Sequence, residues 1–168
     1  MIQRLNYVPR PYAPLAHDHL CEHKRSALWA GMGLGKGVMT LTALSDLEIT
    51  EDVYPALVLG PLRVARDVWP KEVDKWSHLR HLACVPIIGT PEERLRAVKY
   101  DSPIYSINFE NLPWLVEYWG DRWPYKTVIA DESTKLKGYR GSYRTHPVSG
   151  KVFLVGAGGA RARALGTV

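Results

Sequence analysis

Cysteine and long apolar runs are both scarce in this sequence. Only two cysteines, Cys21 and Cys84, occur among the 168 residues, and no secretory leader is recognisable. This favours a reduced, cytoplasmic compartment over a disulfide scaffold. The longest apolar segments fall far short of the about 20 residues that a membrane-spanning helix needs, so we expect a soluble protein with no membrane partner.

Acidic residues are absent from the stretch 135–168. It carries seven Lys and Arg, for a charge of +7, whereas residues 1–134 carry 15 basic and 17 acidic side chains, for −2. A block of one sign suits the phosphate backbone of a nucleic acid. A solvated tail without fixed structure has the same composition, and both interpretations stay open here. The length and the 46% hydrophobic content predict one domain with a continuous core.

The centre of the sequence pattern is a glycine-rich stretch between an apolar run and a helical pattern. Its residues are Ser26 to Ala30 and then Gly31, Met32, Gly33, Leu34, Gly35, Lys36 and Gly37. Glycines at alternate positions let backbone N–H groups turn inward, and the start of a helix adds a positive end, so this order is typical of a phosphate-binding loop. Lys36 is expected to bind the β and γ phosphates.

Two positions depart from the full phosphate-loop pattern. Gly37 stands where Ser or Thr supplies a hydroxyl ligand to Mg²⁺, and Ala30 replaces the first glycine. The missing hydroxyl predicts that Gly37→Thr strengthens Mg²⁺-dependent ATP binding. The alternative is a glycine-rich turn between strand and helix that binds no ligand.

A second stretch, Lys126 to Ala130, is a β-branched run that ends in Asp131 and Glu132. It predicts a buried strand whose carboxyl end presents two carboxylates, which is where a parallel sheet forms its ligand crevice. Asp131 is expected to hold Mg²⁺, and Glu132 to orient or deprotonate the attacking water.

These two stretches resemble motifs I and II of superfamily 2 helicases, and their spelling is closest to phage-encoded Swi/Snf-like DNA helicases. Three further segments resemble upstream, Ia and Ib motifs of that family: Arg10–Tyr12, Leu57–Leu62 with Trp69–Trp76, and Asn108–Leu112. The resemblance implies the first of two RecA-like lobes of a DNA-stimulated ATPase. It also implies ATP and Mg²⁺ as cofactors, double-stranded DNA as partner, and the bacterial host cytoplasm as location.

The resemblance assigns further residues to the nucleotide and to DNA. Tyr12 is placed to stack on adenine, although Ala13 stands where the family has a glutamine, and Gln3 is the only glutamine in the chain. The nucleotide loop is assigned to Gly31, Met32, Gly33, Leu34, Gly35, Lys36 and Gly37. The DNA contacts are assigned to Arg63, Asn108 and Asn111, and the alternatives that stay open are a solvated arginine and asparagines that serve at turns and caps.

Basic side chains alternate with aromatic ones after Glu132. The cations are Lys135, Lys137, Arg140 and Arg144. Such a surface can bind phosphates through its cations and stack bases on its rings. Residues 151–155 then predict a short strand among glycines, as one arm of a hairpin.

Four potential metal ligands lie near the N-terminus: His17, His19, Cys21 and His23. On a helix, His17 and Cys21 share one face and the other two share the opposite face. Four ligands therefore do not converge, and we predict an ordinary helix rather than a structural zinc site.

The predicted fold class is α/β, a RecA-like P-loop NTPase domain with a mostly parallel sheet flanked by helices. Strands are expected at 27–30, 56–60, 85–88, 103–107 and 128–131, with helices at 37–46, 62–76, 91–99 and 111–119 between them.

The favoured function is the ATP-binding lobe of a DNA helicase or translocase. No second lobe and no motif III are recognisable, so we expect the second lobe to come from another chain or to have been lost by truncation, and this chain alone to hydrolyse little ATP. One alternative is a non-catalytic lobe that binds DNA or a host protein as a regulator. A small nucleotide kinase is a third interpretation, disfavoured because no lid-like arginine cluster accompanies an acceptor site.

Overall fold

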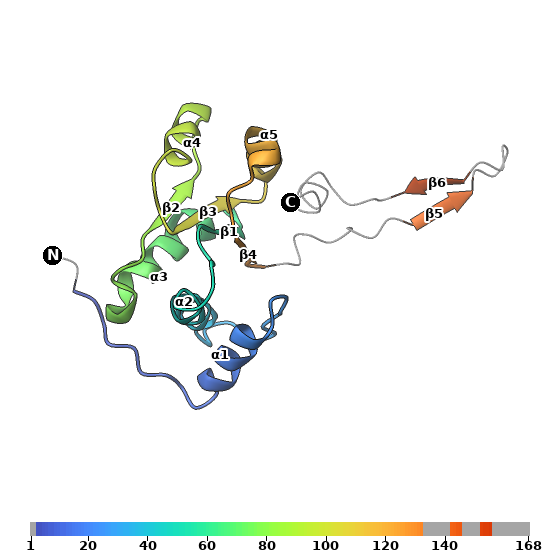
Figure 1. The fold of residues 1–168 in the computed structure, drawn as a ribbon. Helices are drawn as coiled ribbons and strands as arrows, with labels where there is room; N and C mark the ends of the chain where they lie inside the picture. The colour runs from blue at the N-terminus through green and yellow to red at the C-terminus, as the bar shows by residue number, and fades with distance from the viewer. Residues whose placement is uncertain (1–2, 133–141, 146–151, 156–168) are drawn as a thin grey trace.

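The computed structural model describes residues 3–132, 142–145 and 152–155 (Figure 1). Its helices are α1 Ala13–Glu22, α2 Lys36–Leu47, α3 Trp69–Lys75, α4 Pro91–Ala97 and α5 Leu112–Trp119, with short 3-10 helices at Ser77–Leu79 and Gly120–Arg122. Its strands are β1 Ala56–Gly60, β2 Cys84–Ile87, β3 Ile104–Asn108, β4 Thr127–Ala130, β5 Ser142–Thr145 and β6 Val152–Val155. None of the helices in these ranges is long and apolar enough to span a membrane.

A four-stranded parallel sheet forms the centre of the fold, in the order β2-β3-β1-β4. Leu57 of β1 lies level with Tyr105 of β3 on one side and with Val128 of β4 on the other. Every residue of β1 and β3 is buried, as expected for parallel strands that are covered on both faces. The predicted α/β architecture with a parallel sheet is therefore confirmed.

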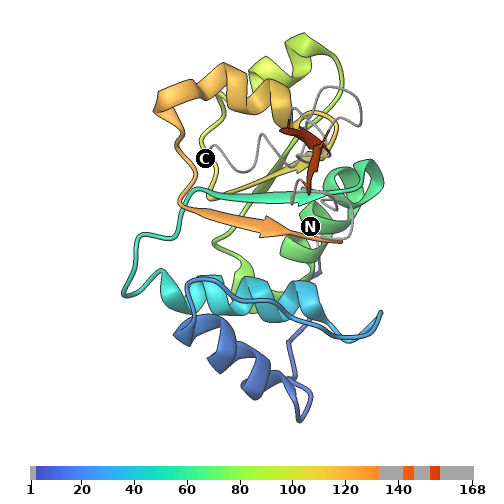
Figure 2. The same cartoon turned by 90° about the vertical axis from the view of Figure 1, so that its right-hand side faces the viewer.

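Alternate residues of β1 pack into two apolar cores, one on each face of the sheet. Ala56 and Val58 pack with Leu41 of α2 and with Trp69 and Val73 of α3. On the other face, side chains from β1, β3, α4 and α5 form a second core that includes Leu57, Leu59, Ile107, Phe109 and Leu115. Figure 2 shows the resulting layers, with α5 on one side of the sheet and α2 on the other.

The N-terminal segment is held against α3 by polar contacts. Leu5 pairs with Trp76 in an isolated parallel bridge, with its N–H donating to the Lys75 carbonyl at 2.7 Å. The Arg4 guanidinium donates to the carbonyls of Val73 and Trp76. It also forms an ion pair with Asp74. The chain then enters α1, which packs along α2. These contacts bring the N-terminal segment alongside both α2 and α3.

The expected helix at 62–76 contains a widened turn. Residues Val64–Val68 form a π-helical turn before α3, and the Trp69 N–H donates to the Val64 carbonyl five residues earlier. Pro70 explains the change, because it has no N–H to offer the carbonyl four residues before it. The other predicted helices agree with α2, α4 and α5 to within two residues at each end.

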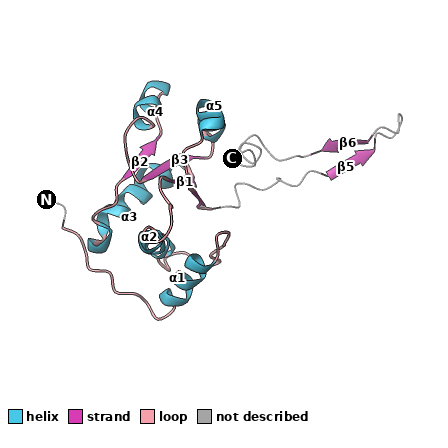
Figure 3. Cartoon of the chain, viewed as in Figure 1, coloured by secondary structure: helices cyan, strands magenta, loops and turns pink. Residues whose placement is uncertain are grey.

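The strand predicted at 27–30 is wrong. This segment is loop between α1 and α2 (Figure 3), and Trp29 within it is 88% exposed. An apolar run becomes a strand only when neighbouring strands accept its backbone hydrogen bonds, and residues 27–30 pair with no strand in the described ranges. The four other predicted strands of this sheet correspond to β1, β2, β3 and β4, each shifted by no more than one residue.

A second, separate sheet contains β5 and β6. The two strands pair antiparallel, with Ser142 opposite Val155 and Thr145 opposite Val152. The strand predicted at 151–155 as one arm of a hairpin is therefore confirmed as β6. The sequence pattern had not marked β5 as the other arm.

Candidate functional site

The glycine-rich loop leads directly into α2. Gly33 and Gly35 have φ values of +75° and +78°, and Gly35 is the residue that caps the start of the helix. Left-handed backbone at these two positions is accessible to glycine without steric cost. Figure 2 shows α2 beginning at the edge of the sheet where β1 and β4 end. The free N–H groups of the first helical turn thus lie at the sheet edge where parallel α/β folds bind ligands.

Lys36 bonds back to the start of this loop. Its ammonium donates to the carbonyls of Ala30 and Gly31, each at 2.9 Å. The lysine is half-buried at the first position of α2. The Lys36 ammonium is therefore held close to the loop backbone, where it can contact an anion bound at the start of the helix.

Tyr12 joins the N-terminal segment to the loop. Its hydroxyl donates to the Leu34 carbonyl at 3.0 Å and accepts from Arg10 at 3.2 Å. The sequence predicts that the Tyr12 ring stacks on adenine, and the structure places this ring beside the glycine loop. Ala13, which follows it, is buried and offers no polar group to a base.

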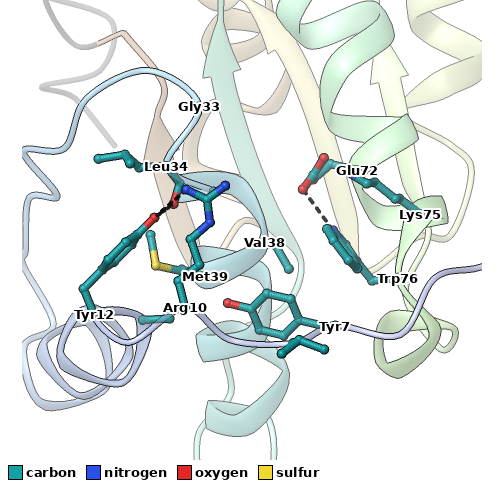
Figure 4. A pocket seen from close by; sticks show the side chains of 13 residues that line it. Tyr7, Arg10, Tyr12, Gly33, Leu34, Val38, Met39, Glu72, Lys75 and Trp76 are labelled. Carbon is teal, nitrogen blue, oxygen red and sulfur yellow. Dashed lines mark hydrogen bonds between the residues drawn. The ribbon is translucent and has the colours of Figure 1, made fainter.

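A pocket of about 190 Å³ lies next to the loop. Side chains of three segments line it, including Tyr7, Arg10, Tyr12, Glu72, Lys75 and Trp76. In Figure 4, Arg10 and Tyr12 stand on one side of the pocket, Glu72 and Trp76 on the other, and Tyr7 between them. Its lining combines aromatic rings with charged side chains, which suits a planar group with polar edges.

Tyr7 is the aromatic side chain shared by both walls. Its ring meets that of Trp76 edge-on, with centroids 5.3 Å apart. Burial raises the pKa of Tyr7, and the nearby Tyr12 raises it further. Tyr7 is therefore a neutral phenol at physiological pH, and it can both donate and accept a hydrogen bond.

Asp131 follows β4 at the carboxyl end of the sheet. Its backbone N–H donates to the Leu59 carbonyl at 2.8 Å, which extends the pairing of β4 with β1. The buried Trp69 indole donates to Asp131 Oδ2 at 3.0 Å. Asp131 is thus an oriented carboxylate at the sheet edge where α2 begins, and carboxylates of this kind suit Mg²⁺.

Glu132 is exposed and has a φ of +57°. Asp131 and Glu132 form a turn after β4. The predicted role of Glu132 in orienting water is not tested by this geometry and stays a prediction.

Gly37 faces α3. A Cβ atom at this position would lie 3.3 Å from Cγ of Glu72 and 3.8 Å from its carboxylate carbon. No hydroxyl is available from residue 37, so position 37 offers no side-chain oxygen to Mg²⁺, whereas Asp131 offers a carboxylate held by Trp69. The loop, Lys36 and Asp131 fit a magnesium nucleotide, and the ligand expected at position 37 is missing.

The two asparagines assigned to DNA bond to each other. Asn111 Nδ2 donates to Asn108 Oδ1 at 2.7 Å, and Asn108 Nδ2 donates to Glu110 at 2.8 Å. Arg94 donates to Asn111 Oδ1 and lies over the Trp114 ring, 4.6 Å from its centroid. Within residues 3–132, these amides are therefore engaged in an internal network, and their DNA role stays a prediction.

The other predicted DNA contacts are scattered. Arg63 is exposed just before the π-helical turn. Arg144 lies in β5. Lys135, Lys137 and Arg140 lie outside the described residues.

The N-terminal helix separates its potential metal ligands as predicted. The His17 ring lies 3.7 Å from Cys21 Sγ and binds Asp46 of α2 at 2.8 Å, while His19 and His23 lie against each other with centroids 4.6 Å apart. Among the described residues, no three His, Cys, Asp or Glu side chains converge on a metal position.

Sequence reasoning gave no function to Glu72 and Lys75 of α3 and to Trp76 directly after it, which form one wall of the pocket. A signal was present in the spacing, because residues 69 and 72 are about one helical turn apart and share one face. The identity of what this face meets depends on how α3 packs against α2. No local pattern contains that information.

Comparison with known proteins gives a fold and a phage relative. No family model matches the chain. Protein p41 of Acyrthosiphon pisum secondary endosymbiont phage 1 is 50% identical over 136 residues, which are 80% of this chain and 30% of that protein. Among solved structures, the Sulfolobus solfataricus SWI2/SNF2 ATPase core in complex with dsDNA is similar, with a TM-score of 0.67 and 22% identity.

The chain shares the fold of that ATPase core. The similarity covers 83% of this chain and 29% of the solved one. The predicted RecA-like fold class is therefore confirmed. The chain spans less than a third of each of these two proteins, at 30% and 29%.

Proposed function

We propose that this chain is the ATP-binding lobe of a DNA-dependent ATPase that works as a helicase or translocase. The observation that carries the proposal is the glycine loop with Lys36 at the start of α2, next to an aromatic pocket and at the sheet edge where Asp131 follows β4. A loop of this kind binds the phosphates of a nucleotide through backbone N–H groups and one lysine. The likeness to a SWI2/SNF2 ATPase core supports the same function.

Each part of the site has a role in this proposal. The pocket between Tyr7 and Tyr12 takes the base, and the loop with Lys36 takes the phosphates. Asp131 holds Mg²⁺, which neutralises phosphate charge when it is bound. Glu132 orients a water molecule. Binding of the phosphates requires Lys36 to release the two loop carbonyls that it now contacts.

Hydrolysis requires groups beyond this chain. In phosphoryl transfer, an arginine supplied from another domain or subunit can raise the rate by about 10³ to 10⁵. We propose that a second RecA-like lobe supplies such groups. The chain alone is therefore expected to bind ATP and to hydrolyse it very slowly.

We propose that double-stranded DNA is the macromolecular partner. The solved neighbour was captured in complex with dsDNA. In this chain, the exposed Arg63 and the basic residues after Glu132 are the candidates for phosphate contacts, because Lys and Arg bind DNA backbones without reading sequence. The free thiols of Cys21 and Cys84 favour a reduced location, for which we propose the bacterial host cytoplasm.

A calorimetric titration of ATP and ADP into the chain, with and without Mg²⁺, tests the proposal. We expect saturable binding that Lys36→Ala abolishes. Lys126→Ala is the matched control, because Lys126 precedes β4 at the opposite edge of the sheet and pairs with Asp52. The absence of saturable binding at millimolar nucleotide would contradict the proposal.

A non-catalytic lobe that binds DNA or a host protein is the second candidate. Gly37 favours it, because the metal-ligating hydroxyl is missing. Ala13 also favours it, because it replaces the glutamine that the family uses for adenine. Binding of a labelled DNA duplex that ignores nucleotide and survives Lys36→Ala would distinguish this function from the first.

A further inference from the structure

We propose that Glu72 supplies the protein ligand to nucleotide-bound Mg²⁺ that Gly37 lacks. The inference rests on the proposed ATP-binding function and concerns the same site. It assigns a metal-binding role to a side chain of α3, outside the glycine loop and outside the Asp131–Glu132 pair.

The first argument is position. A side chain on residue 37 would project directly at Glu72, since its Cβ would lie 3.3 Å from Glu72 Cγ and 3.8 Å from the carboxylate carbon. The Glu72 carboxylate therefore stands beside the place from which a Ser or Thr at residue 37 would act. Glycine at this position leaves room for a longer side chain from the neighbouring helix.

The second argument is orientation. The Trp76 indole donates to Glu72 Oε1 at 2.9 Å, which fixes the carboxylate (Figure 4). Within residues 3–132, no hydrogen bond or ion pair reaches Oε2. Seven residues before Trp76, at the start of α3, the Trp69 indole donates to Asp131 Oδ2 at 3.0 Å. Two tryptophans, one at the start of α3 and one directly after its end, thus orient two carboxylates, Glu72 of α3 and Asp131 after β4.

The third argument is chemical. Mg²⁺ is a hard cation that proteins commonly bind through one or two carboxylates together with substrate phosphates. Glu72 and Asp131 supply such a pair. A carboxylate also differs from the hydroxyl that it replaces, because its charge repels a triphosphate when no cation lies between them. ATP binding by this chain should therefore depend strongly on Mg²⁺.

The test measures ATP affinity by calorimetry, with Mg²⁺ and with a chelator, in the native chain and in Glu72→Gln. Glutamine keeps the side-chain length and an oxygen that accepts from Trp76, so the change is confined to charge. We expect the gain in affinity due to Mg²⁺ to fall by at least about tenfold, and the Mg²⁺-free affinity to stay equal or to rise. Glu117→Gln, at an exposed position of α5, controls for the loss of one negative charge.

A crossed variant gives the test its direction. Gly37→Thr in the Glu72→Gln background should restore most of the lost gain in ATP affinity due to Mg²⁺. The same change in the native background should raise that gain by a smaller factor. An equal Mg²⁺ effect in the native chain and in Glu72→Gln would overturn the inference. So would ATP binding in the native chain that ignores Mg²⁺.

A measurement on the native chain does not depend on how any variant folds. Mn²⁺ added with ATP should broaden the indole N–H signals of both Trp69 and Trp76 before those of Trp114 and Trp119, which belong to α5 on the other face of the sheet. Broadening of Trp69 without Trp76 would overturn the role of Glu72. The absence of ATP binding in any condition would instead contradict the proposed function itself.

Discussion

β1 and the segment that precedes α2 are both apolar runs that lead into a helix at the same edge of the sheet, yet only β1 is a strand. All five residues of β1 are buried, and the strand pairs with β3 on one side and with β4 on the other. Residues 27–30 have no strand neighbour in the described ranges, and Trp29 is 88% exposed. The difference shows that hydrogen-bonding partners, more than apolar composition, decide whether such a run becomes a strand.

The sheet and the glycine loop also differ in what holds them in place. Two apolar cores hold β1 and β3 between α2 and α3 on one face and α4 and α5 on the other. The glycine loop is held by a few polar contacts, from Lys36 to two carbonyls and from Tyr12 to a third. We expect substitutions in the sheet to change the free energy of unfolding, and substitutions in the loop to change ligand binding.

The largest expected effect is on the sheet. Leu57→Ala removes a side chain that is 0% exposed and leaves a cavity in the core beneath α4 and α5. We expect the free energy of unfolding to fall by about 2 to 5 kcal/mol in a denaturant titration. Met32→Ala, in the loop and 98% exposed, is the matched control and should change it by less than about 0.5 kcal/mol. Similar losses for the two variants would break the comparison.

Lys36→Ala should reverse that pattern. Its ammonium bonds only to exposed loop carbonyls among the described residues, so the free energy of unfolding should change by less than about 0.5 kcal/mol. ATP affinity should fall at least about tenfold, since the variant loses the ammonium that pairs with the phosphates. Calorimetry and denaturant unfolding on one preparation measure both. A destabilised variant would mean that the loop contributes to folding after all.

The starts of α4 and α2 offer a smaller test. Thr90 and Glu93 form a reciprocal capping box at α4, with hydrogen bonds of 3.3 and 2.7 Å, whereas α2 begins at Gly35 without a side-chain cap. Thr90→Ala should lower the free energy of unfolding by about 1 kcal/mol, and Thr90→Ser should leave it nearly unchanged. Equal values for the two variants would show that the hydroxyl does not stabilise α4.

The smallest expected effect is a pH dependence where α1 meets α2. Burial lowers the pKa of His17, but its hydrogen bonds to Asp18 and Asp46 outweigh this, and the net result is a raised pKa. A raised pKa means that the stabilising contact is fully present below the ordinary value of 6.5 and is lost as the pH rises through the higher value in the folded state. The melting temperatures of the native chain and of His17→Asn should therefore converge as the pH rises.

Melting curves collected between about pH 5.5 and pH 8.5 cover this interval. His81→Asn is a control histidine variant, because His81 also faces a carboxylate, that of Glu48 at 3.5 Å, but lies outside the contact between α1 and α2. A gap between native and His17→Asn curves that widens with pH would contradict the assignment.

Much of the sheet could be predicted, because its strands carry their information locally. β1 and β3 are short runs of Ile, Leu, Val and Tyr between turn residues, and such runs predict buried parallel strands in any context. The start of α4 at Pro91 agrees with the predicted helix at 91–99, and Thr90 and Glu93 form a capping box there. Asp131 was found because it ends a strand.

The pocket could not be predicted in the same way. Its two walls come from the N-terminal segment and from α3, which are joined by the Leu5 bridge to Trp76 and by Arg4. That pairing links residues about 70 positions apart in the chain, with separations of 69 and 72 for the two Arg4 hydrogen bonds. Nothing in the local pattern of either segment specifies the other.

The sequence by itself determined the order of β1 to β4 and of the helices between them, the glycine pattern that precedes α2 and the carboxylate that follows β4, because these depend on local periodicity and residue chemistry. Tertiary structure alone decided that residues 27–30 are loop, because a strand needs a partner to accept its backbone hydrogen bonds. It also decided that Glu72 faces Gly37, because only the packing of α3 against α2 brings a carboxylate to the position where the loop lacks a hydroxyl.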